Sequence, residues 1–211
     1  MVSKRKDVRR EAELHEEWAR VAAETDRFEV YEKEHAARIA RLSDRLAALF
    51  HLSTLDRTSL RVAALLHDIG EAAMNRSYVR RAGPLSAEER IDLGRHPVIG
   101  EQEAARLETE PSVQLIVRWH HEWWNGAGYP DGLCRTEIPL PARILRVADA
   151  YAALTEQRPY RAAFGPEEAR RHLVEMSGIE FDPEIVGAFL DIKEGLEEHS
   201  ATEQKLAYEP R

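Results

Sequence analysis

The sequence contains only one cysteine, Cys134, so the chain has no internal disulfide. Disulfides are frequent in secreted proteins and rare in reducing compartments, and we therefore expect a cytoplasmic protein. The chain also lacks any apolar run close to the ~20 residues that a membrane-spanning helix needs. Its first residues, "MVSKRKDVRREAELHEEW", are charged and contain no hydrophobic signal core. We predict no association with a membrane.

The chain also has few basic residues relative to acidic ones, 30 against 38, which gives a net charge of -8. No broad surface would then attract the phosphates of DNA or RNA, which argues against a polymeric nucleic acid as partner. An anionic substrate would have to be held by local cations, either metal ions or particular arginines.

Apolar residues recur at helical spacing along nearly the whole chain, and no segment alternates as a β-strand does. We predict an all-α fold, a single helical bundle in one domain. The main predicted helices cover residues 7–24, 30–50, 53–70, 112–124, 141–155, 165–176 and 181–192.

Local signals mark several helix ends. "STLD" from Ser53 and "SAEE" from Ser86 have the pattern of a capping box, in which the first side chain accepts a hydrogen bond from the helix backbone. Asp182 before Pro183 predicts another helix start. Gly70 is expected to end the helix that Ser53 begins.

Two apolar stripes predict how the first helices pack. The stripe of the second helix consists of Ile39, Leu42, Leu46 and Leu49, and that of the first helix of Leu14, Trp18 and Val21. The stripe of the first helix favours packing on the same chain. A homodimer seam would also use it, so that possibility stays open.

Histidine and aspartate are concentrated where these helices would turn them inward. The residues concerned are His35, His67, Asp68, His96, His120, His121 and Asp149. Asp149 is the most informative, because Leu145 and Ala152 place it on an apolar stripe, and a buried carboxylate is costly unless it is paired or binds a metal. Together these residues predict a metal centre. Outside this set, we expect surface or capping positions for His15, His51, His172 and His199.

Adjacent residues in this set indicate how many ions bind. Neighbours on a helix point about 100° apart, so His67 and Asp68 suit two ions better than one. His120 and His121 form a second such pair. We predict two divalent metal ions with Asp68 as the bridge between them. Nitrogen and oxygen ligands without thiolate favour iron or manganese, and nickel or zinc would also fit.

A pair of divalent ions suits the hydrolysis of a phosphodiester. Such a pair lowers the pKa of a bridging water and neutralises the oxygens of an in-line phosphoryl displacement. Coordination positions left open for water and substrate distinguish a catalytic site from a structural one. We therefore count Asp68 among the catalytic residues.

Two of these segments also resemble a known family. "LLHDIG" at 65–70 and "HHEWWNGAGYPDGL" at 120–133 are similar to the signature of the HD-GYP domain, a subgroup of the HD-superfamily metal-dependent phosphohydrolases. The similarity extends from "HAARIA" at 35–40 through "RHPVIG" at 95–100 and "PARILRVADAYAALTEQRPYR" at 141–161 to "FDPEIVGAFL" at 181–190. It covers nearly all of the chain beyond residue 30.

The resemblance implies an all-helical bundle around two or three metal ions. It implies hydrolysis of the bacterial signalling molecule cyclic di-GMP to the linear dinucleotide or to GMP, with the seven residues above as metal ligands. It further implies that Gly128, Tyr129 and Pro130 form a loop against the substrate. Arg158 and Arg161 match positions that contact substrate phosphate, for which a guanidinium is suited.

The chain departs from the family pattern near this site. Glu71 stands where the family has a lysine close to the substrate phosphate, and Asn125 and Ala152 replace aspartates. Tyr31 stands where three-metal members carry glutamate, so we expect two metals and the linear dinucleotide as product. Because of this family position, we count Glu71 with Asp68 among the candidate catalytic residues. An alternative is that Glu71 itself binds a metal ion.

Several functions therefore stay open. The favoured one is a working phosphodiesterase for cyclic di-GMP or a related cyclic dinucleotide, because all seven ligands are present. The alternative is a weak or inactive domain that binds a nucleotide or a signalling-protein partner. A third is a phosphohydrolase acting on another nucleotide. In each case we expect an N-terminal helix at 1–29, the HD-GYP domain at 30–199 and a frayed tail at 200–211.

Overall fold

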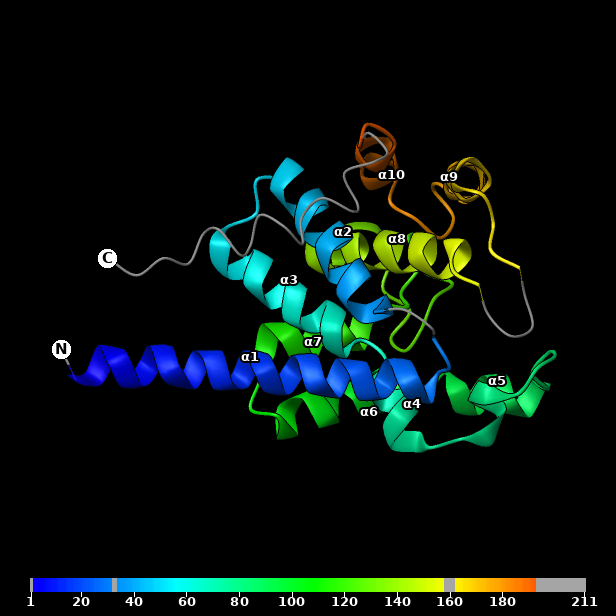
Figure 1. Ribbon diagram of the computed structural model, residues 1–211. Helices are drawn as coiled ribbons and strands as arrows, with labels where there is room; N and C mark the ends of the chain where they lie inside the picture. Colours follow the sequence, from blue (N-terminus) through cyan, green and yellow to red (C-terminus); the bar gives the residue numbers. More distant parts are fainter. Residues whose placement is uncertain (1, 32–33, 158–161, 193–211) are drawn as a thin grey trace.

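The computed structural model describes residues 2–31, 34–157 and 162–192 (Figure 1). Within these ranges the secondary structure is helical and no strand is present, which confirms the predicted all-α fold. The tail predicted at 200–211 lies outside the described residues.

The elements follow the sequence in a simple order. They are α1 (Val2–Phe28), α2 (His35–Leu49), α3 (Thr54–Leu66), α4 (Ile69–Met74), the 3-10 helix η1 (Ser77–Arg80), α5 (Ala87–Leu93), α6 (His96–Arg106), α7 (Pro111–Trp119), the 3-10 helix η2 (Arg135–Glu137), α8 (Leu140–Thr155), α9 (Pro166–Glu175) and α10 (Pro183–Leu190).

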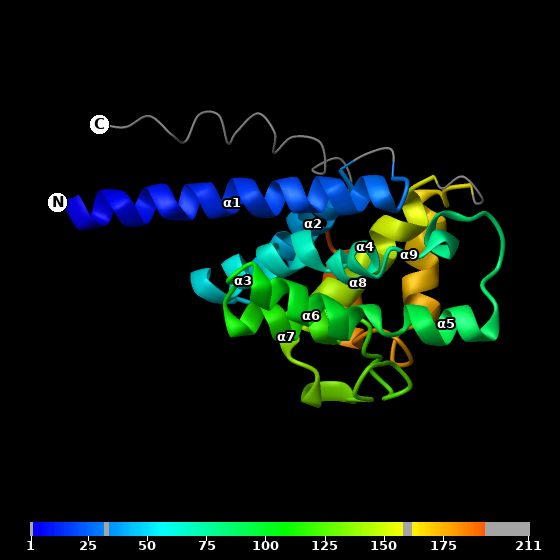
Figure 2. The ribbon, with the colours of Figure 1, turned by 90° about the horizontal axis from the view of Figure 1, so that it is seen from below.

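Helix α1 is a long rod that lies along one side of the bundle and projects beyond the other helices at its N-terminal end (Figures 1 and 2). It contacts α2, α3 and α4. Trp18 and Val21 pack against the hydrophobic core, so the predicted packing on the same chain is confirmed for these two residues of the stripe. Leu14 is not among the residues packed on the core.

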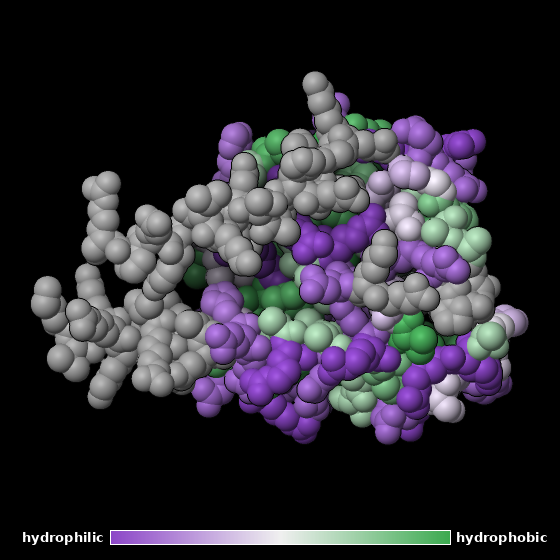
Figure 3. Space-filling view, in the orientation of Figure 1, coloured by the Kyte–Doolittle hydropathy of each residue, from purple (hydrophilic) through white to green (hydrophobic). Residues whose placement is uncertain are grey.

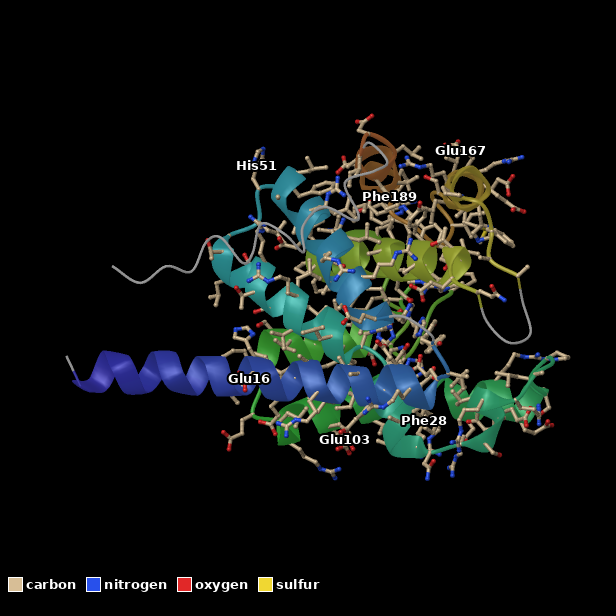
Figure 4. The ribbon with its side chains drawn as sticks, viewed as in Figure 1. Glu16, Phe28, His51, Glu103, Glu167 and Phe189 are labelled. Carbon is tan, nitrogen blue, oxygen red and sulfur yellow. The ribbon has the colours of Figure 1, made fainter. Side chains whose placement is uncertain are left out.

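The core lies where the remaining helices cross. Helix α2 packs on α3 and α8, α3 on α7, and α6 on both α4 and α7. Ile39, Leu46, Leu60 and Leu145 are fully buried there. Helix α10, which carries Phe189 (Figure 4), packs on α8. The ring centroid of Phe189 lies 4.7 Å from that of Tyr151.

The predicted helix starts are confirmed. The side chain of Ser53 accepts a hydrogen bond from the backbone of Asp56, and Ser86 forms a reciprocal capping box with Glu89. Asp182 caps α10 by accepting from the backbone of Glu184.

The predicted role of Gly70 is wrong, because this residue lies inside α4 and does not end α3. Helix α3 stops at Leu66. A Cβ on Gly70 would lie 2.1 Å from the carbonyl oxygen of His96 and 2.8 Å from the backbone nitrogen of Gly100. Glycine is needed here because α4 and α6 approach each other closely.

Two predicted helices are too long. Helix α2 begins at His35 and not near residue 30, because Val30 has a left-handed φ of 66°. Helix α7 ends at Trp119, and residues 120–124 are turns or irregular chain. Leu49 is 51% exposed, so the last residue of the predicted stripe of α2 is not part of the core. This end of α2 protrudes, and His51 just beyond it points away from the bundle (Figure 4).

Among the described helices, none combines the length and apolar character that crossing a membrane requires. On the face shown in Figure 3, hydrophilic side chains predominate over the described residues, with smaller hydrophobic patches between them.

Candidate metal centre

The seven predicted ligands converge, and six of them lie at helix ends. His35 begins α2, His67 and Asp68 connect α3 to α4, His96 begins α6, His120 and His121 follow α7, and Asp149 lies within α8. Five of the seven are buried: His35, His67, His96, His120 and Asp149. Side chains from five parts of the chain therefore reach one enclosed place.

Asp68 joins two groups of potential ligands. One group consists of Asp68, His96, His120 and His121, and the other of His35, His67 and Asp68, with ligand atoms within 4.8 Å of one another in each. Oδ2 of Asp68 lies 2.9 Å from Nε2 of His67. Its Oδ1 lies 3.3 Å from Nε2 of His96 and 3.6 Å from Nε2 of His120. Asp68 thus presents one oxygen to each group, as a bridging ligand would.

Four histidines are oriented through Nδ1. In His67, His96 and His120 this atom lies 3.0, 2.9 and 2.6 Å from the carbonyl oxygen three residues earlier. Since a carbonyl only accepts, Nδ1 carries the proton and Nε2 offers a lone pair. His35 is held in a comparable way, with Nδ1 2.7 Å from Oε2 of Glu156.

Several buried atoms at the centre need a further partner. Nε2 of His35, Nε2 of His67 and Oδ1 of Asp68 have no aligned hydrogen bond within the described part of the chain. Nε2 of His96 lies 3.3 Å from Nε2 of His120, so two lone pairs face each other. Buried polar atoms are normally satisfied, and a cation would satisfy all of these. The residues present therefore fit divalent metal ions.

The charges agree with this fit. Burial would raise the pKa of the Asp68 carboxyl, but His67, His120 and His96 hold it well below its usual range, so the group is ionised. Burial, with His120 and His96 nearby, lowers the pKa of His121 well below its usual value. Burial alone would also lower the pKa of His67, yet Asp68 and Asp149 raise it to about 10. This position favours a positive charge, which a metal ion would supply.

Asp149 stands slightly apart from both groups. The prediction that it lies on a buried stripe is confirmed, because it is 8% exposed between the fully buried Leu145 and Ala152. Its Oδ1 lies 3.9 Å from Nε2 of His67. Its Oδ2 accepts a hydrogen bond from Arg146 at 3.0 Å.

Glu71 lies beside the centre on α4. Its Oε1 is 3.9 Å from Nδ1 of His96. Burial and the nearby Asp68 raise the pKa of Glu71 to about 7. Glu71, Asp68 and Glu29 line one cavity of about 200 Å³ together with Tyr78 and Arg81. The cavity next to Asp68 therefore has more acidic than basic side chains.

The loop after the histidine pair turns back onto it. A Cβ on Gly128 would lie 2.2 Å from the backbone nitrogen of Trp123 and 2.5 Å from the carbonyl oxygen of His121, so only glycine fits. The backbone of Tyr129 donates to that same carbonyl, and its ring stacks on His121 with centroids 4.9 Å apart. Pro130 follows through a cis peptide bond. The absence of a side chain at Gly128 thus allows this loop to lie against His121.

Tyr129 and Pro130 also border a second cavity, of about 590 Å³. Its other lining residues are Arg90, Ile91, Gly94, Arg95, Val98, Ile99 and Gln102. The volume is within the range of about 300–1,000 Å³ that is usual for small-molecule sites. Tyr129 therefore contacts His121 through its ring and also borders this cavity.

The remaining predicted residues have diverse positions. Arg158 and Arg161 lie outside the described residues, as does His199. Asn125 is exposed and accepts a hydrogen bond from the backbone of Ala127. His15 and His51 are exposed, as predicted, and His172 is half-buried on α9.

Sequence reasoning missed three side chains that support the centre: Glu156, which orients His35, Arg146, which binds Asp149, and Glu122. Oε1 of Glu122 accepts from the backbone nitrogens of Asp131 and Gly132 and so anchors the loop. Glu156 and Arg146 lie seven residues after and three before Asp149, spacings that a helix places near one face. Their spacing from Asp149 is the sequence feature that could have pointed to Glu156 and Arg146.

A comparison with known proteins identifies the class. Residues 21–185 match the family model described as the HD domain, and the chain therefore belongs to that family. The match begins inside α1, and the division at residues 29 and 199 stays a prediction.

Particular relatives confirm the resemblance to HD-GYP proteins. The chain is 37% identical over 162 residues to a cyclic di-GMP phosphodiesterase of Thermotoga maritima and 31% identical over 159 residues to a 3'3'-cGAMP-specific phosphodiesterase of Vibrio cholerae. These alignments cover 75% and 74% of this chain. A solved HDG"Y"P protein from Bdellovibrio bacteriovorus has the same fold, with a TM-score of 0.61 at 23% identity over 75% of this chain and 51% of that one.

The chain spans only part of these curated relatives, 44% of the first and 30% of the second. What the relatives do as whole proteins is therefore carried over only as a proposal.

Proposed function

We propose that this chain is a metal-dependent phosphodiesterase that hydrolyses cyclic di-GMP, or a related cyclic dinucleotide, to the linear dinucleotide. The observation that carries the proposal is Asp68, whose two carboxylate oxygens face two separate groups of histidines. The relatives named for cyclic di-GMP and 3'3'-cGAMP support the substrate class.

Two divalent ions, iron or manganese in preference to nickel or zinc, would be held by the seven residues of the centre. When bound, they supply an activated water at neutral pH and neutralise charge on the phosphate. His96, His120 and His121 would form one site with Asp68, and His35 and His67 the other. Asp149 would complete the second site through Oδ1.

The chain's own residues would position the nucleotide. Gly128 lets the backbone approach His121, and Tyr129 stacks its ring on His121 and borders the larger cavity. We propose that part of the substrate occupies this cavity, where Arg90 and Arg95 offer positive charge. Arg158 and Arg161 stay in the proposal as phosphate contacts.

The second candidate is a weak or inactive domain that binds a nucleotide or a signalling protein. Glu71 favours it, because a buried carboxylate beside Asp68 opposes an anionic ligand. The homodimer and the cytoplasmic location also stay predictions.

The test is anaerobic incubation of iron- or manganese-loaded protein with cyclic di-GMP and, separately, with 3'3'-cGAMP, followed by chromatography. We expect linear dinucleotide without further GMP, and two ions per chain by elemental analysis. Asp68→Asn should abolish turnover, whereas His172→Ala, which removes a histidine outside the centre, should leave it unchanged.

Intact substrates from protein that holds two ions would contradict hydrolysis of these nucleotides. A binding titration with the same two nucleotides would then test the second candidate. Accumulation of GMP would contradict the predicted product.

A further inference from the structure

The two oxygens of Asp149 have different neighbours. Oδ2 accepts a hydrogen bond from Nη1 of Arg146, one turn earlier on α8, at 3.0 Å. Oδ1 is directed instead toward Nε2 of His67, 3.9 Å away. The ion pair therefore occupies one oxygen of Asp149 and leaves the other facing the candidate metal centre.

Arg146 is itself held from a second side. Its Nη2 donates to the carboxylate of Glu180, which is buried, and its guanidinium lies 5.9 Å from the ring of Phe181. Nε of Arg146 has no hydrogen-bond partner within the described ranges. The two carboxylates therefore decide how the guanidinium is oriented.

Glu180 connects this ion pair to the loop that carries Tyr129. The backbone nitrogen of Trp124 donates to the carbonyl of Glu180 at 3.1 Å, and that of Asn125 donates to the carbonyl of Ile179 at 3.0 Å. The chain Asp149–Arg146–Glu180 thus links α8 to the turn before α10 and, through it, to the loop beside His121.

A buried positive charge next to a metal centre is unfavourable unless a negative group offsets it and the charged side chain has a role there. Arg146 would repel nearby metal ions, and Glu180 offsets that charge. Arg146, held by Glu180, orients the carboxylate of Asp149. A carboxylate that ligates a metal is usually held in this way by a hydrogen bond from outside the site. Without Arg146, Asp149 would be free to rotate and to present either oxygen.

We infer that Arg146 is a positioning residue, which holds Asp149 with Oδ1 toward the metals and is itself oriented by Glu180. The inference rests on the proposed metal centre. It predicts that loss of Arg146 weakens the binding of the ion near His67 more than that of the ion near His96.

Arg143 provides a matched control. It lies on α8 three residues before Arg146, and its side chain is 14% exposed against 15% for Arg146. It forms a buried ion pair with Asp182, just as Arg146 does with Glu180. Arg143 has no contact with Asp149 among the described interactions. A loss of fold stability alone should therefore affect both variants alike.

The experiment compares metal-free Arg146→Met, Arg146→Lys and Arg143→Met proteins as each is titrated with Co²⁺ against a competing chelator. We expect Arg146→Met to weaken one of two Co²⁺ sites by about 10–100-fold, with a changed cobalt absorption spectrum. Arg146→Lys should restore part of that affinity. Arg143→Met should bind as the wild type does, although its unfolding midpoint falls.

Three results would overturn the inference. If Arg146→Met binds Co²⁺ with wild-type affinities, Arg146 does not position Asp149, although the metal centre itself stands. If Arg146→Met and Arg143→Met lose Co²⁺ affinity equally, the loss comes from a general decrease in fold stability. Wild-type protein that binds no Co²⁺ would contradict the metal centre, and this inference with it. If Arg146→Met does not fold, Glu180→Gln takes its place, with Asp182→Asn as control. Glu180→Gln should then weaken the same site and Asp182→Asn should not.

Discussion

The ring of Tyr31 lies flat against the imidazole of His35, with centroids 3.7 Å apart and planes inclined by 10°. Nδ1 of His35 lies 2.7 Å from Oε2 of Glu156, which also holds this ring. Tyr31 stands where, by resemblance, three-metal members have glutamate. A stacked ring at this position offers no carboxylate to a third ion, which supports two metals in this chain.

Tyr31→Glu should therefore add a metal site. We expect three ions per chain, and further cleavage of the linear dinucleotide to GMP, because a carboxylate would then lie beside His35. Elemental analysis and product chromatography measure both effects. Tyr31→Phe keeps the stacked ring and should keep two ions. Two ions in Tyr31→Glu would show that another residue limits the metal number.

Glu71→Lys should increase activity. The change replaces a buried carboxyl, which is only partly ionised at neutral pH because burial and Asp68 raise its pKa to about 7, by a positive charge. A phosphate should then bind more tightly. We expect kcat/KM for cyclic di-GMP to rise about tenfold, equivalent to about 1.4 kcal/mol. Glu71→Gln removes the carboxyl without adding a positive charge, so its kcat/KM should lie between those of the wild type and Glu71→Lys. A loss of bound metal in Glu71→Gln would instead identify Glu71 as a ligand.

Gly70→Ala should destabilise the fold. The added Cβ would meet the backbone of His96 and Gly100, and relief requires α4 and α6 to separate. We expect the free energy of unfolding to fall by about 2–3 kcal/mol in urea denaturation. Gly187→Ala is the control, because nothing lies within 4 Å of its Cβ. A helical alanine there should stabilise α10 by about 0.5–1 kcal/mol.

Asp131→Asn should destabilise the protein in a pH-dependent way. Hydrogen bonds from Arg118 and Trp119 lower the pKa of Asp131 to about 2. A lowered pKa stabilises the fold above the unfolded-state value near 3.8, and the effect is lost as pH falls toward 2. Urea denaturation of both proteins should therefore give a constant difference from pH 8 to pH 5 and a smaller one at pH 3.5. A difference that does not change with pH would exclude this ion pair as its source.

The sequence alone predicted the helices and most of their starts. The capping side chains of Ser53, Ser86 and Asp182 act on backbone groups two or three residues away, so their effect can be read locally. Helix ends were harder to predict. Glycine is common just after the last residue of a helix, so Gly70 was predicted to end one. Instead it allows α4 to approach α6, a helix that is distant in the sequence.

For the metal centre, the sequence supplied the ligand types, their number and the likeness to HD-GYP proteins. The adjacent pairs His67–Asp68 and His120–His121 predicted two ions, because adjacent side chains diverge. The prediction that His120 and His121 serve different ions is wrong, since both lie in the group of His96. How the ligands divide between the two groups depends on helix packing. His96 meets His120 and His121, and His35 meets His67, across contacts between different helices.

The supporting contacts between distant positions depend on the tertiary structure alone. Glu156 reaches His35 across 121 positions, and Glu180 reaches Arg146 across 34. No local pattern predicts such pairs, because each depends on how far two helices are rotated and shifted against each other. The sequence by itself determined which residues could bind metal and which segments are helical. The packing of α2, α3, α6 and α8 decided which lone pairs face one another and which oxygen of Asp149 stays available.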